Sequence, residues 1–221
     1  MNYEKYIIDK ITEMSGKYTP YQIFSDWIAM SALSIQNQCT LIRDEIYEKR
    51  ESLYLNIANK YSKDEIRKLC NMNGALALAL ETKFGDILGE IYMKSGCGSK
   101  STGQFFTPYH ISYLTAKLAY ENKIKELSGK KLEINEPSCG GGGMIIAVAQ
   151  VMKENNINYQ REMHVVAQDL DWNGVYMTYV QLSLLGIRAI VAQGDTLQNS
   201  FKRGYDKLRT LRTPAEMGVI L

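Results

Sequence analysis

Four consecutive glycines, residues 140–143, constrain this chain more than any other feature of its sequence. An ordered glycine costs roughly 0.5–1 kcal/mol relative to alanine, so the run costs about 2–4 kcal/mol unless the backbone needs positive φ or a very close approach. The run ends the segment 136–143 (EPSCGGGG), which follows a strand-like segment (132–135) and precedes an apolar helix-like one (144–152). A strand, a glycine loop and a helix start are typical of a cradle for a nucleotide-like ligand. A flexible loop without a ligand is the alternative interpretation.

Composition limits the classes of protein to consider. With 221 residues, 45% of them hydrophobic, the chain can bury the core of one large domain or two small ones. Its net charge of +2 means that any contact with DNA depends on a local patch. The 4 cysteines form no CxxC pair, and only 2 histidines accompany them, so we expect no metal site. Free thiols, no signal-peptide core and no apolar run of about 20 residues predict a soluble cytoplasmic protein without a membrane segment.

The first hundred residues are expected to form a helical N-terminal domain, residues 1–100. Thr19 with Pro20, and later Ser62, carry helix-capping signatures, and a further helix is expected over 86–94. We assign this region a scaffold role. After a loop rich in small residues, Thr107 is expected to cap a helix that begins at Pro108 and ends near residue 122.

The rest of the chain, within a predicted second domain at 101–221, alternates strand and helix patterns. Strands are expected over 132–135, 164–168, 188–193 and 217–221, with helices over 144–155 and 172–185. This order predicts an α/β fold with a parallel sheet covered by helices, and ligands at the carboxyl ends of the strands.

Acidic residues follow these strand ends: Asp169, with Asp171 nearby, and Asp195. A carboxylate at the end of the second strand accepts hydrogen bonds from both hydroxyls of a ribose, at roughly 1.5–3 kcal/mol each. Asp195 is placed to meet an adenine amino group. The alternative is that these residues are solvated turn residues or helix caps.

Two classes of ligand compete for the predicted site. A dinucleotide requires G-x-G-x-x-G or A and an acid about 20 residues later, but Ile145 occupies the third small position and Asp169 comes much later. Glu136 would repel a pyrophosphate and attract the cationic amino-acid group of S-adenosylmethionine. The sequence therefore favours S-adenosylmethionine over NAD as the cofactor.

Several segments in this order carry a family resemblance: 103–108 (GQFFTP), 136–143 (EPSCGGGG), 168–169 (QD) and 194–197 (GDTL). Together they resemble the modification subunit of type I restriction-modification systems, an N6-adenine DNA methyltransferase. The resemblance runs from about residue 86 to 197 and implies a Rossmann-like, S-adenosylmethionine-dependent methyltransferase core after a helical N-terminal domain. It implies cofactor contacts by Gln104, Phe105, Phe106, Thr107 and Pro108 at the methionine end, Glu136, Cys139, Gly140 and Gly142 at the amino-acid part, Asp169 at the ribose and Asp195 at the adenine.

The chain departs from the family at the catalytic motif, Asn or Asp followed by Pro-Pro and Phe or Tyr, which it lacks. That motif accepts hydrogen bonds from the adenine amino group and stacks on the flipped base. Aligning the preceding segment puts Thr213 and Pro214 at the catalytic register, where a threonine hydroxyl is a poor replacement, so no catalytic residue is assigned.

The predicted sheet has about four strands where the family's has seven. An apolar last strand, 217–221, at a sheet edge would favour a homodimer, a partner chain or a truncated relative, and a strand inside its own sheet is the alternative. A basic cluster precedes it and is a candidate DNA contact, although a solvated loop explains it too. Its members are Lys202, Arg203, Lys207, Arg209 and Arg212.

The leading functional hypothesis is an S-adenosylmethionine-dependent adenine-N6 DNA methyltransferase that acts with DNA and with a partner subunit or a second copy. The alternative is a cofactor-binding or regulatory protein that has lost the catalytic loop. A third hypothesis, a Rossmann protein for a different nucleotide, would be favoured by binding of NAD without binding of S-adenosylmethionine.

Overall fold

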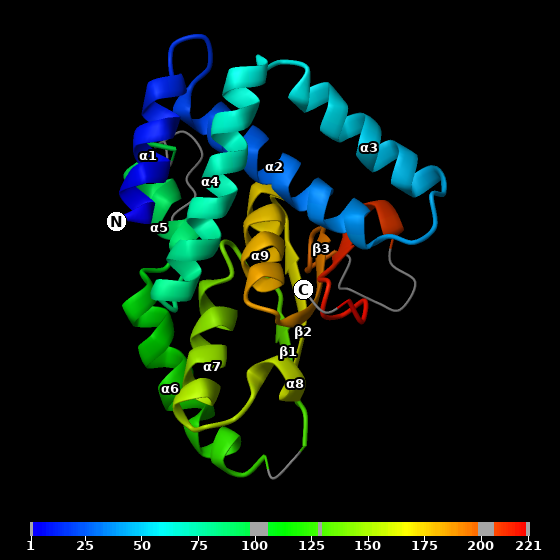
Figure 1. Cartoon of the computed structure of the whole chain (residues 1–221). Coiled ribbons are helices and arrows are strands. Elements are labelled where there is room, and N and C mark those ends of the chain that lie inside the picture. The colour runs from blue at the N-terminus through cyan, green and yellow to red at the C-terminus, as the bar shows by residue number, and fades with distance from the viewer. Residues whose placement is uncertain (1, 98–105, 128–129, 199–205, 220–221) are drawn as a thin grey trace. The chain divides into compact units, whose positions relative to one another are not determined.

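The computed structural model describes residues 2–97, 106–127, 130–198 and 206–219 (Figure 1). The chain divides into two compact units. One is formed by Met1–Lys83 with Ile87–Phe106 and the other by Phe84–Asp86 with Thr107–Leu221. We call them the helical unit and the sheet unit. The predicted boundary near residue 100 between two domains stays a prediction.

The helical unit confirms the helices expected in the first part of the chain. They are α1 (Tyr3–Met14), α2 (Pro20–Cys39), α3 (Glu45–Ala58), α4 (Lys63–Thr82) and α5 (Ile87–Lys94). Both predicted capping signatures are present: Thr19 accepts the Gln22 amide, and Ser62 forms a complete capping box with Glu65. Aromatic rings fill the core, where Phe24 packs edge-on against Trp27 and Tyr92 with ring centroids 5.8 and 5.4 Å apart.

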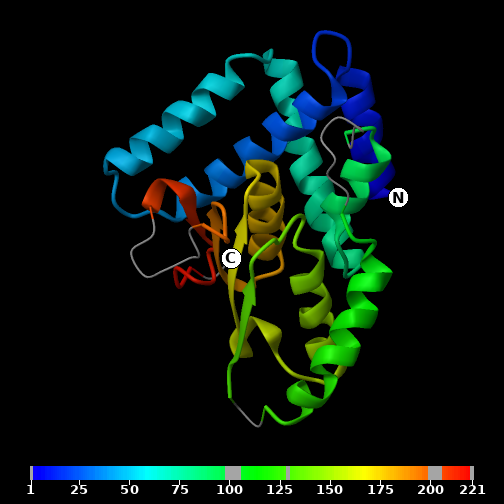
Figure 2. The same ribbon diagram turned by 180° about the vertical axis from the view of Figure 1, so that it is seen from behind.

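The sheet unit contains a four-stranded sheet in the order β1-β2-β3-β4. Strands β1 (Leu132–Glu136), β2 (Met163–Asp169) and β3 (Arg188–Gln193) are parallel, and β4 (Thr210–Arg212) is antiparallel to β3. Helices α7 (Gly143–Glu154) and α9 (Trp172–Leu184) connect the parallel strands and lie on one face of the sheet (Figures 1 and 2). The predicted α/β, Rossmann-like arrangement is therefore confirmed for three strands and their two crossover helices.

Burial alternates along the strands, because successive side chains point to opposite faces. Val165 and Ala189, which are paired in register, are fully buried beneath the helices, whereas Val166 and Ile190 on the other face are only partly buried. Parallel sheets usually have both faces covered. Here the second face is partly exposed at Val166 and Ile190 and becomes buried toward the carboxyl ends of the strands, at Gln168 and Ala192.

Helix α6 (Tyr109–Lys125) precedes the sheet and lies along α7 (Figure 1). The Tyr109 hydroxyl donates to Gln150 Oε1 at 2.6 Å, and the Tyr113 hydroxyl donates to Glu154 Oε2 at 2.6 Å. The predicted cap of this helix is wrong. The capping position is Pro108, whose extended backbone (ψ 134°) keeps it out of the helix, and it makes no side-chain cap hydrogen bond.

The expected strand over 217–221 is also wrong for its described residues. Met217 N–H donates to Thr213 O and Val219 N–H donates to Pro214 O, so the segment closes as turns. Gly218 has a φ of +77°, which an extended strand does not contain. The fourth strand is β4 instead, and the short helix α8 (Tyr159–Glu162) was not predicted either. Residues 220–221 lie outside the described part.

Candidate functional site

The glycine loop connects the carboxyl end of β1 to α7 and is held against the next strand. The Cys139 N–H donates to Gln168 O on β2 at 2.9 Å, and the Gly142 N–H returns to Cys139 O at 2.8 Å. Gly140 and Gly142 have φ values of +51° and +90°, in the left-handed region where a side chain is strained. Two of the four glycines are therefore required by backbone conformation.

The other two glycines are required by a close approach. A Cβ atom added at Gly141 or Gly143 would lie 3.0 or 3.1 Å from a carboxylate oxygen of Asp86. The Gln181 side-chain amide donates both to Asp86 Oδ1 at 2.8 Å and to Gly141 O at 2.6 Å. Thr178 Oγ1 donates to Gly140 O at 2.8 Å. The buried polar side chains of Asp86, Thr178 and Gln181 thus contact the glycine loop so closely that no side chain would fit on it. We call these three residues the polar support of the loop.

Sequence reasoning did not identify this support. Thr178 and Gln181 are fully buried on α9, where their neighbours are largely apolar, and Asp86 was expected only to begin a helix. The available signal was a pair of polar residues one turn apart within an apolar helix, since buried polar groups need hydrogen-bond partners.

Asp169 ends β2 and lies against the glycine loop, where the sequence predicts a ligand-binding carboxylate. Its Oδ2 accepts the Gly140 N–H at 2.7 Å and its Oδ1 accepts the Asp171 N–H at 2.9 Å. A Cβ at Gly174 on α9 would lie 3.0 Å from its carboxyl carbon. The carboxylate is only 9% exposed and is fixed in position from three sides.

Glu136 and Cys139 border the same loop. Glu136 Oε1 accepts the Ser138 N–H at 3.2 Å. Burial raises the pKa of Glu136, and the neighbouring Asp169 charge raises it further. Burial also raises the pKa of the Cys139 thiol, which is therefore uncharged at neutral pH.

The loop after β3 is hydrogen-bonded to the end of β2 and to the segment that follows β1. The Gly194 N–H donates to Asp169 O at 2.8 Å, and Thr196 Oγ1 donates to Pro137 O at 2.7 Å. Asp195 lies between them, and its Oδ1 accepts the amides of Leu197 and Gln198 at 2.9 and 3.3 Å, as in a turn. The structure therefore brings the segments of Glu136, Asp169 and Asp195 together at one edge of the sheet.

Of the residues predicted to contact the methionine end of the cofactor, the structure describes only Phe106, Thr107 and Pro108. The Phe106 ring packs edge-on against Tyr92 in the helical unit, with centroids 5.0 Å apart. Thr107 and Pro108 are exposed just before α6. Gln104 and Phe105 lie outside the described residues, and so do Lys202 and Arg203 of the basic cluster.

The remaining basic residues, Lys207, Arg209 and Arg212, are exposed on the short 3-10 helix η1 (Lys207–Arg209) and on β4. Thr213, which the alignment puts at the catalytic register, is fully buried. Its Oγ1 donates to Ile187 O at 2.7 Å and accepts the Ala189 N–H at 2.9 Å. This hydroxyl fixes the start of β3 and is not available to a substrate.

Within the described ranges, no three His, Cys, Asp or Glu side chains cluster in a way that could hold a metal ion. Nor is any helix there long and apolar enough to cross a membrane.

Residues 81–212, more than half of the chain, match the N-6 DNA methylase family. The chain belongs to that family. The matched segment contains Asp86, the glycine loop, Asp169 and Asp195. The recognition of an N6-adenine methyltransferase family from the sequence motifs is thereby confirmed.

Two solved structures are similar to this family member at low identity. One is a class I S-adenosylmethionine-dependent methyltransferase from Listeria monocytogenes, with a TM-score of 0.47, 13% identity, and coverage of 89% of this chain and 55% of that one. The other is a type I restriction-modification system methyltransferase subunit from Streptococcus thermophilus, with a TM-score of 0.47, 17% identity, and coverage of 88% and 43%. The chain thus spans about half the length of these structures. No curated protein matches it.

Proposed function

We propose that this chain binds S-adenosylmethionine at the glycine loop and serves in N6-adenine methylation of DNA. The observation that carries the proposal is the position of Asp169, a carboxylate fixed between the Gly140 amide and Gly174 at the carboxyl edge of the sheet. In a member of the N-6 DNA methylase family, that is where a ribose would be held.

The residues around Asp169 fit the rest of this cofactor. Glu136 offers a carboxylate to the ammonium group. Cys139, Gly140 and Gly142 on the same loop would hold the rest of the amino-acid part of the cofactor. Asp195 would meet the adenine amino group, and Phe106, Thr107 and Pro108, with Gln104 and Phe105, would border the methionine end. Bound there, S-adenosylmethionine would supply an electrophilic methyl group.

DNA is the proposed substrate, and the basic cluster is the proposed phosphate contact. Lys207, Arg209 and Arg212 are exposed, as phosphate recognition requires. We propose that the chain acts in the cytoplasm with a partner subunit or a second copy. Affinity for duplex DNA should fall steeply with salt, and replacing all three cations with glutamine should flatten that dependence.

A second candidate function is cofactor binding without methyl transfer. The sequence lacks the Asn-Pro-Pro-aromatic type of motif. At the aligned position, the Thr213 hydroxyl is fully used in backbone hydrogen bonds. Such a protein would regulate or complete an active subunit.

Calorimetric titration of the purified chain with S-adenosylmethionine tests the cofactor site. We expect micromolar binding that Asp169→Ala weakens about tenfold or more, the scale of one charge-assisted hydrogen bond. Asp9→Ala is the matched control, because Asp9 is an exposed aspartate on α1, outside the glycine-loop site. Equal affinities for wild type and Asp169→Ala would remove Asp169 from the site.

Labelled methyl transfer to adenine-containing duplex DNA then separates the two candidates. The methyltransferase is supported if the wild type transfers the labelled methyl group and the Asp169→Ala variant transfers less of it. Binding of the cofactor without transfer, also in the presence of a partner subunit, supports the second candidate. Binding of NAD alone would contradict both.

A further inference from the structure

Thr178 places one hydroxyl group directly against the glycine loop. The side chain is fully buried on α9, and its Oγ1 donates to Gly140 O at 2.8 Å. A Cβ added at Gly142 would lie 3.1 Å from the same oxygen atom. A threonine inside a helix commonly donates to the carbonyl one turn earlier, as Thr82 does to Leu78 O at 3.0 Å. Because a hydroxyl has one proton, Thr178 uses its only donor on the loop instead.

Gly140 carries this contact on to Asp169, the carboxylate at the centre of the proposed cofactor site. Its N–H donates to Asp169 Oδ2 at 2.7 Å, while its carbonyl oxygen accepts the Thr178 hydroxyl. Glycine is the residue with the most backbone freedom, and Gly140 has a left-handed φ of +51°. The two hydrogen bonds therefore define how its backbone is turned. Without the hydroxyl, the Gly140 amide would no longer be held toward Asp169.

The Asp169 carboxylate depends on Gly140 for its orientation. Its Oδ1 accepts the Asp171 N–H at 2.9 Å, a local bond within the same turn of the chain. Its Oδ2 accepts the Gly140 N–H, so the two bonds together fix the rotation of the carboxylate plane. A carboxylate oxygen has more than one acceptor site. Each oxygen therefore keeps a site for one hydroxyl group of the ribose.

We propose that Thr178 is a positioning residue for cofactor binding. Its hydroxyl orients Gly140, and the Gly140 amide orients the Asp169 carboxylate toward the two ribose hydroxyls. Thr178 itself contacts no cofactor atom, because it is fully buried behind the loop. The proposal rests on the function proposed above for the glycine loop. It differs from a purely structural role, since the effect of the hydroxyl on binding passes through Asp169 and through the ribose.

Calorimetry with S-adenosylmethionine on four chains tests this coupling. They are the wild type, Thr178→Val, Asp169→Ala and the variant with both substitutions. Valine keeps the branched shape of threonine and removes the hydroxyl. We expect Thr178→Val to weaken binding about fivefold or more in the wild-type chain but less than about twofold in the Asp169→Ala chain, because effects within one hydrogen-bond network do not add. Thr178→Ser keeps the hydroxyl and should bind within about twofold of the wild type.

Two nucleosides supply a second readout on the same chains. Adenosine and its dideoxyribose analogue share the adenine base, but the analogue lacks the two neighbouring ribose hydroxyls. The wild type should bind adenosine more tightly than the analogue, and Thr178→Val should lose most of this preference. A substitution that only destabilises the fold would weaken the binding of both nucleosides by the same factor.

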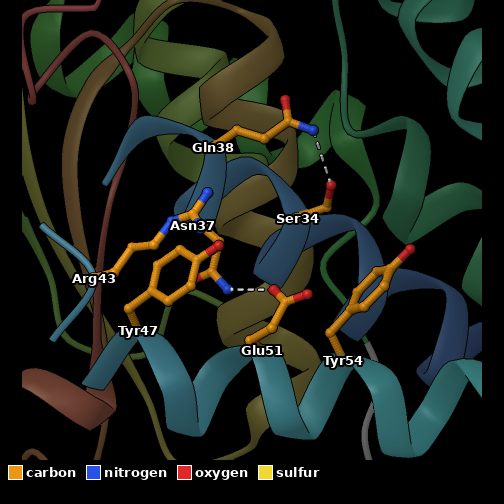
Figure 3. A pocket seen from close by; sticks show the side chains of 7 residues that line it. All are labelled: Ser34, Asn37, Gln38, Arg43, Tyr47, Glu51 and Tyr54. Carbon is orange, nitrogen blue, oxygen red and sulfur yellow. Dashed lines mark hydrogen bonds between the residues drawn. The ribbon is translucent and has the colours of Figure 1, made fainter. Parts of the chain in front are cut away.

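Asn37→Ala is the matched control for a loss of stability outside the site. Asn37 is a buried polar side chain on α2 of the helical unit, and its Nδ2 donates to Glu51 Oε2 on α3 at 3.0 Å (Figure 3). The variant should unfold at a lower temperature than the wild type and bind S-adenosylmethionine with unchanged affinity. Thermal unfolding of every variant reports whether it is folded. If Thr178→Val does not fold, Thr178→Cys, whose thiol is a weak donor, replaces it in both experiments.

Three results would overturn the proposal and leave the proposed function standing. They are unchanged affinity in Thr178→Val, a loss of equal size with and without the Asp169 carboxylate, or an unchanged preference for adenosine over its analogue. The function proposed for the loop fails separately, if the folded wild type does not bind S-adenosylmethionine or if Asp169→Ala binds it as tightly as the wild type. The proposal for Thr178 then fails with it.

Discussion

Gly142 combines a left-handed φ of +90° with a space too small for a Cβ, which would lie 3.1 Å from Thr178 Oγ1. Gly142→Ala should therefore lower the free energy of unfolding by about 2 kcal/mol or more. Gly74→Ala is the matched control, because Gly74 lies inside α4 with nothing within 4 Å of its added Cβ. That variant should gain about 0.4–1 kcal/mol. Urea unfolding of the two variants measures both values, and a loss at Gly74 equal to that at Gly142 would contradict the assignment.

The contribution of Glu136 to the stability of the fold depends on pH. Burial raises its pKa in the folded chain above the ordinary 4.5, so the folded state keeps a proton that the unfolded state has lost. The contribution of Glu136 to stability therefore falls as pH rises from about 4.5 through the raised pKa. Glu136→Gln removes this titration. Relative to wild type, the variant should gain stability across that window, as urea unfolding between pH 4 and 8 would show. A difference that does not change with pH would contradict the shift.

At the scale of the element, adjacent side chains of β2 point to opposite faces of the sheet, one covered by helices and one partly exposed. Val165 is fully buried, and Val166 is partly exposed. Val165→Thr buries a hydroxyl and should cost about 1–3 kcal/mol. Val166→Thr keeps the β-branched shape on the other face and should change stability by no more than about 0.5 kcal/mol. Chemical unfolding compares the two, and equal losses would mean that both faces are core.

The same elements show what the sequence could predict. Strands β1 to β3 were predicted within a residue of their observed ends, because their apolar residues are bounded by clear turn signals. Strand β4 was missed since it has three residues, of which only Leu211 is buried, too few for a period-two pattern. Asp169 was predictable because ligands collect at strand ends. Asp86 was not, because its relation to Gly141 and Gly143 exists only once the chain has folded.

At the scale of the whole molecule, the sheet separates two groups of residues that the alignment places in one site. The proposed cofactor residues gather where β1, β2 and β3 end, whereas Thr213 is hydrogen-bonded to Ile187 and Ala189 at the start of β3. A cofactor held at the carboxyl ends of the strands would therefore lie at the opposite end of β3 from that threonine. Under the proposed function, Thr213 is therefore not the residue that contacts an adenine.

The contacts that hold the glycine loop join parts of the chain that are far apart in sequence. Gly140 is tied to Asp169, Gly141 to Gln181, and Pro137 to Thr196, across 29, 40 and 59 residues. Such contacts can form only after the intervening strands and helices have come together, because closing long loops costs chain entropy first. The cradle is thus expected to assemble after the transition state for folding. Substitutions there would accelerate unfolding and leave the folding rate nearly unchanged.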